Sequence, residues 1–180
     1  VEETVTAESF DPAQLYAPGA PSAAAVATEQ WVERQRSIRA RAGGGLKVIN
    51  RHPFDDIAVE VVHLGPGGGN RDLGRRLHQA LALAVDPEQA DEDLQERLRR
   101  VYASELWRPG WREVPLTAPV AEGVVLEGVA DLVFVSDGVY TVVDFKSDGD
   151  RPEYHQQLSG YAYALSQATG APVRAVLAVV

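Results

Sequence analysis

The amino-acid sequence predicts an α/β domain with a central mixed β-sheet flanked by helices. The hydrophobic residues follow a helical period in much of the chain before residue 113 and a strand period from residue 113 onward. Three strand-like segments then follow one another, and one further helix separates them from a last apolar strand. This order of elements is typical of an α/β domain with a mixed sheet.

The composition limits the class of protein. The chain has 180 residues, of which 45% are hydrophobic, so it can form one domain with a real core, alone or with an extension. Because it has no cysteine, disulfides, thiolate zinc sites, iron–sulfur clusters and cysteine nucleophiles are excluded. A net charge of −9 argues against a simple electrostatic nucleic-acid binder. An acidic chain can still act on phosphates when metal ions supply the positive charge.

The sequence carries no membrane or export signal that we recognise. Its apolar runs are too short to span a bilayer. Its first residues, "VEETVTAESF", are acidic and polar, unlike a secretory signal peptide. We therefore expect a cytoplasmic protein that has no membrane partner.

The first third of the chain predicts an arm, a helix and a strand. Residues 1–21 carry scattered proline, glycine and alanine without a period, which indicates an extended arm or linker. Residues 22–40 have a helical pattern, with Ser22 as the N-cap and "RAGGG" as the end. The segment "DIAVEVVHL" is a strand candidate, and "GPGGGN" after it is a flexible break. That break lacks the lysine and serine of a P-loop, so we do not interpret it as a phosphate-binding loop.

Two helices are predicted next. Residues 71–85 have a helical period, Asn70 is the expected cap, and the expected buried stripe is Leu73, Leu77, Leu81 and Ala84. Asp86-Pro87 opens the second helix, with proline in its first turn. The expected core side of this helix is Leu94, Leu98, Val101 and Tyr102. Its expected solvated face is Asp93, Glu96, Arg97, Arg99 and Arg100.

The remaining elements are three strands, a helix and a strand. The strand segments are "EVPLTAPV", "VVLEGVADLVFV" and "VYTVVDFK". The helix covers about residues 153–169 and ends at Gly170 and Pro172. Its expected buried stripe is Tyr154, Gln157, Leu158, Tyr161 and Leu165. The segment "VRAVLAVV" is the last strand.

The turn Asp137-Gly138 predicts the register of the second and third of these strands. This dipeptide is a strong signal for a two-residue hairpin loop, so Ser136 should face Val139. Counting back along both strands places Asp131 directly opposite Asp144, with Cβ atoms roughly 5 Å apart. Lys146 is two residues beyond Asp144 and points to the same face.

Two opposed carboxylates on apolar strands need a compensating charge. Like charges across a strand pair repel, and burying them unpaired is unfavourable. A divalent cation bound by oxygen ligands is the natural partner, and Lys146 beside it could orient a water or stabilise charge on a phosphate. The alternative is that these residues lie at the rim of the sheet, hydrated or paired with Lys146.

The motifs "GVADLVFV", "VVDFKSD" and "QLSGY", in this order, resemble the PD-(D/E)XK nuclease core. More narrowly, they are similar to the RecB-type nuclease domain at the C-terminus of bacterial helicase–nucleases, the RecB- and AddA-like enzymes of the UvrD family. The resemblance covers residues 70–180, and residues 22–54 faintly resemble the segment that links helicase to nuclease. It implies a restriction-endonuclease-like core, a single domain over residues 22–180 and an N-terminal helical extension.

The resemblance also implies site residues. The implied catalytic residues are Asp131, the D-x-K pair Asp144 and Lys146, and the Q-x-x-x-Y pair Gln157 and Tyr161. Further matches are His78 in "LGRRLHQAL" and Glu113 in "REVPL". The implied ligands of one or two Mg²⁺ or Mn²⁺ ions are His78, Glu113, Asp131, Asp144 and the backbone carbonyl of Phe145.

Each of these residues also has a structural alternative. His78 flanks Leu77 and Leu81, so it could be a core histidine, and Tyr161 could be core packing. Glu113 has rivals for an acidic role in Glu122 and Glu127. Tyr154 and His155 are more often surface or packing residues than ligands.

The function implied by the resemblance is metal-dependent hydrolysis of DNA phosphodiesters. We expect exonuclease rather than endonuclease action, on single-stranded DNA, in double-strand break repair and recombination. The expected partner is a helicase domain or subunit. Two alternatives stay open: a nuclease-fold module that no longer cuts and has a DNA-binding or structural role, and an unrelated α/β binding domain.

Overall fold

The computed structural model describes residues 52–180. The arm predicted for residues 1–21 and the helix predicted for residues 22–40 lie outside the described residues, as does most of the expected linking segment. Among residues 52–180, no helix is both long and apolar enough to cross a bilayer.

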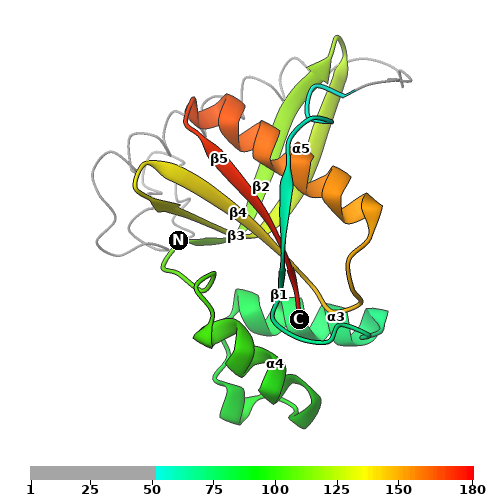
Figure 1. Cartoon of the computed structure of the whole chain (residues 1–180), viewed down its shortest axis with the longest axis vertical. Helices are drawn as coiled ribbons and strands as arrows, with labels where there is room; N and C mark the ends of the chain where they lie inside the picture. Colours follow the sequence, from blue (N-terminus) through cyan, green and yellow to red (C-terminus); the bar gives the residue numbers. More distant parts are fainter. Residues whose placement is uncertain (1–51) are drawn as a thin grey trace, which may run out of the picture.

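The described residues form a five-stranded mixed sheet in the order β1-β5-β4-β3-β2 (Figure 1). The strands are β1 (Val59–His63), β2 (Trp111–Ala121), β3 (Val124–Ser136), β4 (Val139–Lys146) and β5 (Val173–Val179). β5 runs parallel to both β1 and β4, while β3 is antiparallel to both β4 and β2. The prediction of a mixed sheet in an α/β domain is confirmed.

Helices cover both faces of this sheet. The helices are α3 (Arg71–Ala82), α4 (Glu92–Ala103) and α5 (Pro152–Thr169), with a 3₁₀ turn at Pro87–Gln89. Buried side chains of α3 and α4 pack against Leu132, Val143 and Phe145 on one face. Buried side chains of α5 pack against the other face. Figure 1 shows α5 lying across the strands of the sheet. Residues 52–180 therefore form one hydrophobic core on each face of the sheet.

The helix α3 begins as predicted but ends three residues early. The Asn70 side chain accepts a hydrogen bond from the Leu73 N–H at 2.9 Å, which confirms the cap. The Val85 N–H bonds to the Ala80 carbonyl and the Ala84 N–H to the Leu81 carbonyl, which is a Schellman ending. Ala84 has φ of 50° and is exposed, so its predicted place in the buried stripe is wrong. The turn was missed because alanine stands where such endings favour glycine.

The second helix begins later than predicted. Asp86 caps only the 3₁₀ turn, where its carboxylate accepts from the Glu88 N–H at 2.9 Å. Ala90 is then extended, and α4 begins at Glu92. The predicted core side is confirmed, since Leu94, Leu98 and Val101 are buried and Tyr102 is partly buried against the same core.

The hairpin β3–β4 has the predicted turn and register. Asp137 and Gly138 both have positive φ, at 52° and 78°, as a type I′ turn requires. Ser136 pairs with Val139, and pairing continues to Leu132 opposite Val143. This is the register that the turn predicted, and the backbone pairing ends one step before Asp131 and Asp144.

Candidate active site

The strand pairing between β3 and β4 stops where the two acids meet. The last backbone pair is Leu132 with Val143. At the next position a side chain replaces the backbone as the hydrogen-bond acceptor: Asp131 Oδ2 accepts a hydrogen bond from the Phe145 N–H at 2.7 Å. The carboxylate is thereby held at the point where β3 and β4 separate.

The helix α3 brings His78 to this point. His78 Nδ1 lies 2.8 Å from Asp131 Oδ1, a contact across 53 residues of sequence. The segment before α3 passes close to Ser147, which follows β4. This approach requires glycine at position 69, because an added Cβ there would stand 2.8 Å from Ser147 Oγ. Burial lowers the pKa of His78, but the hydrogen bond and charge of Asp131 outweigh it, so this pKa is raised. His78 is thus a partner of Asp131 and not a histidine enclosed in the apolar core.

Asp144 and Lys146 form the second pair. Lys146 Nζ is 2.7 Å from Asp144 Oδ2, and the two side chains are only 15% and 3% exposed. That oxygen has no hydrogen-bond partner, so the ammonium lies at ion-pair distance without hydrogen-bond alignment. Burial, followed by the Asp131 charge, raises the pKa of Asp144 to about 6, although Lys146 opposes the shift. Asp144 is therefore a buried carboxylate that lacks full compensation.

Glu113 is the third acid at this level of the sheet. The pairs Arg112–Leu132 and Val114–Ala130 on either side place Glu113 opposite Asp131. Its φ is 51°, a conformation that costs a residue other than glycine of order 1–3 kcal/mol and that often marks functional sites. Burial and then the Asp131 charge raise the pKa of Glu113, and His78 acts against this. Three neighbouring strands thus each contribute one carboxylate.

Tyr154 of α5 borders the Lys146 ammonium. Lys146 Nζ lies 4.8 Å from the centre of the Tyr154 ring, at cation–π distance. The Tyr154 hydroxyl donates to Asp148 Oδ2 at 2.7 Å. Tyr154 is partly buried and packs against the core on the α5 side of the sheet, which agrees with the packing role that the sequence favours. The predicted stripe of this helix already puts Tyr154 on the same side as Gln157 and Tyr161, but no sequence pattern indicates that it meets Lys146.

Gln157 and Tyr161 contact each other and not the acids. Gln157 Nε2 donates to the Tyr161 hydroxyl at 2.6 Å. Tyr161 is 4% exposed and lies over Gly128 of β3, where an added Cβ would overlap its ring. Within residues 52–180, no hydrogen bond joins this pair to Asp131 or Asp144. The two residues flank the candidate site on its α5 side.

The donor chemistry of these residues fits a hard divalent cation. Carboxylate oxygens and one imidazole are the available ligands, and Asp144 Oδ2 is a buried oxygen without a hydrogen-bond partner. In the part of the chain that the structure describes, no three His, Asp or Glu side chains are grouped closely enough to hold a metal ion. Instead His78 holds Asp131 and Lys146 holds Asp144.

A pocket of about 580 Å³ opens beside this site. His78 and Lys146 line it on one side, and the chain around Ser147 and the start of α3 line it on another. Its volume lies within the range of about 300–1,000 Å³ that is usual for small-molecule sites. The pocket gives a ligand access to His78 and to Lys146 at the end of β4.

Comparison with known proteins gives one match. A family model described as the PD-(D/E)XK nuclease superfamily matches residues 91–180, half of the chain. The matched range includes Glu113, Asp131, Asp144, Lys146, Gln157 and Tyr161, whereas His78 precedes it. No curated protein and no solved structure matches the chain.

Proposed function

Because the chain belongs to the PD-(D/E)XK nuclease superfamily, we propose that it hydrolyses phosphodiester bonds of DNA with the help of Mg²⁺ or Mn²⁺. One observation carries this proposal. Two acids of adjacent strands, Asp131 and Asp144, each contact a side chain that lines a pocket, and the buried Asp144 has a raised pKa.

The proposed ligands are Asp131 and Asp144, with His78, Glu113 and the carbonyl of Phe145. A bound cation supplies a water of lowered pKa and neutralises charge on the phosphate. The Phe145 N–H and His78 fix the orientation of the Asp131 carboxylate. Donors of this kind around a ligating carboxylate tune its position and basicity.

Lys146 is the proposed electrostatic catalyst. Its ammonium is largely buried, and burial lowers the pKa of Lys146. The charge of Asp144 and the contact with it raise this pKa by more than burial lowers it, so the ammonium is charged at neutral pH. A buried ammonium beside the pocket stabilises negative charge that develops on a phosphate more strongly than an exposed one. Gln157 and Tyr161 would orient the reacting groups or the DNA from the α5 side.

The finer features of the proposal rest on the motif order. His78, Glu113, Asp131, Asp144-x-Lys146 and Gln157-x-x-x-Tyr161 follow one another as in RecB-type nuclease domains. We therefore propose exonuclease action on single-stranded DNA, within a helicase–nuclease that acts in double-strand break repair and recombination. The helicase, as a domain or a subunit, would deliver the strand.

The test is cleavage of a labelled single-stranded DNA oligonucleotide by the purified chain with Mg²⁺ or Mn²⁺. Asp144→Asn should abolish cleavage, because the amide cannot act as an anionic ligand. Asp137→Asn is the matched control: it makes the same change at the turn of the same hairpin, where asparagine also accepts the positive φ.

Two outcomes would contradict the proposal. One is cleavage by Asp144→Asn at the wild-type rate. The other is a wild-type chain that binds Mn²⁺ in calorimetry but never cleaves DNA, with or without a helicase partner. The second result would favour a nuclease-fold module that no longer cuts.

A further inference from the structure

The pocket beside the site concentrates positive charge in an acidic chain. The whole sequence has 26 acidic and 17 basic residues. Among the side chains that line the pocket, four are basic (Arg71, Arg75, Lys146 and Arg151), and one, Asp148, is acidic. A ligand in this pocket therefore meets a field opposite in sign to that of the chain as a whole, which favours an anion.

The four basic side chains differ in whether they already form an ion pair with a carboxylate. Lys146 pairs with Asp144, Arg75 with Asp72 at 2.7 Å, and Arg151 with Asp148 at 2.9 Å. Arg71 makes no ion pair or hydrogen bond with any residue of the described chain 52–180. Its charge is the one most available to a ligand.

The basic residues of α3 form a row that leads to the site. Arg71, Arg75 and His78 are spaced by four and three residues, so they lie on one side of the helix, and all three line the pocket. Seven helical residues span about 10 Å. This exceeds the rise of about 3.4 Å per nucleotide in one strand of a duplex. A phosphate held at Arg71 is therefore one nucleotide or more away from a phosphate beside His78.

We propose that Arg71, supported by Arg75, binds a backbone phosphate of the nucleic-acid strand outside the bond that is cleaved. The strand then enters along the first two turns of α3 and reaches His78 and Lys146, the pocket residues that contact Asp131 and Asp144. This inference rests on the proposed nuclease function and assigns the path of the nucleic-acid strand across the site. Arg75 contributes less than Arg71, because Asp72 already matches its charge.

The test measures binding of a fluorescein-labelled single-stranded DNA oligonucleotide by anisotropy, with Ca²⁺ as the divalent cation and a series of NaCl concentrations. We expect Arg71→Gln to weaken binding roughly 3–10-fold and to reduce the salt slope by about 1. Arg75→Gln should have a smaller effect. Arg108→Gln is the control, because the Arg108 side chain is exposed, is not part of the pocket and, within residues 52–180, donates a hydrogen bond only to the Glu105 carbonyl.

Cleavage kinetics give a second readout. A phosphate contact away from the cleaved bond binds ground state and transition state alike, so Arg71→Gln should raise KM more than it lowers kcat. A variant Arg71→Gln that matches Arg108→Gln in affinity, salt slope and KM would overturn the inference.

The two proposals fail in different ways. If the wild type cleaves DNA but Arg71→Gln behaves like the control, the phosphate subsite is wrong and the nuclease function stands. If the wild type binds DNA through Arg71 but does not cleave it, the subsite stands and the proposed hydrolysis is wrong. A wild type that neither binds nor cleaves the oligonucleotide contradicts both.

Discussion

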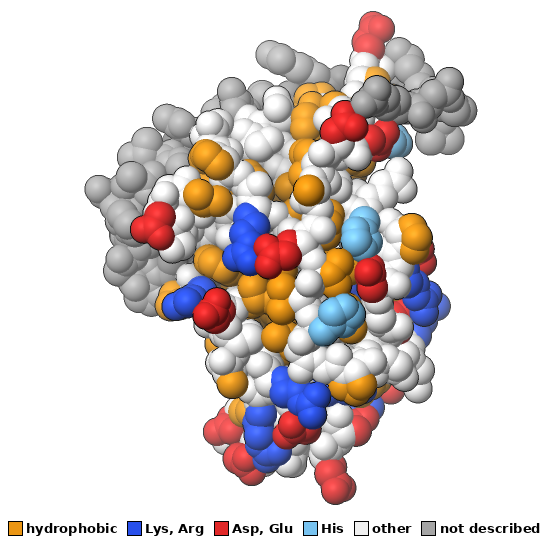
Figure 2. All heavy atoms as spheres, in the orientation of Figure 1, with side chains coloured by type: hydrophobic (Ala, Val, Ile, Leu, Met, Phe, Trp, Pro, Cys, Tyr) orange, Lys and Arg blue, Asp and Glu red, His pale blue; other side chains and the backbone are white. Residues whose placement is uncertain are grey.

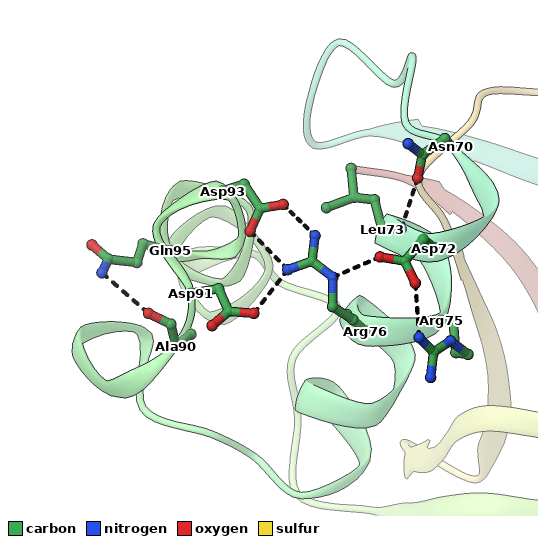
Figure 3. A network of polar contacts seen from close by, with 9 residues as sticks. All are labelled: Asn70, Asp72, Leu73, Arg75, Arg76, Ala90, Asp91, Asp93 and Gln95. Atoms are coloured by element: carbon green, nitrogen blue, oxygen red, sulfur yellow. Dashed lines mark hydrogen bonds and ion pairs between the residues drawn. The ribbon is translucent and has the colours of Figure 1, made fainter.

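Two charged clusters involve α3, and they differ in how well their charges are matched. In the Arg76 cluster, the guanidinium of Arg76 contacts Asp72, Asp91 and Asp93, which ties α3 to the start of α4 (Figure 3). Its three acids are half-exposed or more. On the face seen in Figure 2, acidic and basic side chains are interspersed over the region of α3 and α4.

The site cluster, formed by His78, Asp131, Asp144 and Lys146, has the opposite character. Arg76 holds the pKa of Asp93 below its usual range, whereas burial raises the pKa of Asp144 to about 6. Hydrogen-bond donors and positive charges around a carboxyl group stabilise its charged form and lower its pKa. Burial with too few donors destabilises the charged form and raises the pKa. A buried acid with a raised pKa, such as Asp144, is therefore the candidate for function.

The largest expected effect is on kcat, and it distinguishes Lys146 of the site cluster from Arg76 of the Arg76 cluster. Lys146→Met should lower kcat for DNA cleavage by roughly 10²–10³-fold, because it removes a buried charge aimed at the reacting phosphate. Arg76→Met should leave kcat within about twofold, since surface ion pairs contribute little. Single-turnover cleavage with both variants measures this. Equal rates for Lys146→Met and the wild type would break the comparison.

The next effect concerns histidines. His78→Asn should weaken Mn²⁺ binding by about 10–100-fold, because His78 contacts Asp131 and is itself a proposed ligand. His155→Asn is the control, since His155 pairs with the loop residue Asp150 at 2.5 Å, outside the site. Titration calorimetry gives both affinities. Unchanged affinity in His78→Asn would remove His78 from the metal site.

A smaller effect is the dependence of stability on pH. Asp144 has a pKa of 3.8 as a free side chain and about 6 in the fold, so the folded state binds more protons between these values. The free energy of unfolding should therefore fall by roughly 1–3 kcal/mol as the pH rises from about 4 to about 6. Urea unfolding over this range measures it.

Two variants isolate this contribution. Asp144→Asn should remove most of the fall between pH 4 and 6. Asp93→Asn should retain it, because the lowered pKa of Asp93 gives a contribution that is present above pH 4 and lost only at lower pH. An Asp144→Asn variant with the wild-type pH profile would show that the carboxylate is better compensated than its contacts indicate.

The smallest effect belongs to the Arg76 cluster. Arg76→Gln should lower the melting temperature by about 1–3 °C, because exposed ion pairs contribute weakly even in a network. The loss should shrink in 1 M NaCl, where the Debye length is about 3 Å. Thermal unfolding at two salt concentrations measures this. A loss larger than about 5 °C that is insensitive to salt would show that the Arg76 cluster is a structural core element.

The acids illustrate how much of the site could be predicted. Asp131 and Asp144 were placed opposite each other from the turn Asp137-Gly138 alone. Glu113 could not be aligned with them in this way, because the pairing of β2 and β3 shifts by one residue at a bulge between Pro119 and Ala121. Counting from the turn of that hairpin would put Glu113 opposite Leu132, and only the bulge moves it opposite Asp131.

By itself, the sequence determined the strands, the helices and the register of one hairpin. These depend on hydrophobic period, caps and turn sterics, which act over a few residues. Only the tertiary structure shows that His78 meets Asp131, that β5 lies between β1 and β4, and that Arg71, beside a pocket, makes no ion pair within residues 52–180. It also decided the raised pKa of Asp144. Burial and charge pairing join segments far apart in the chain, so no local pattern specifies them.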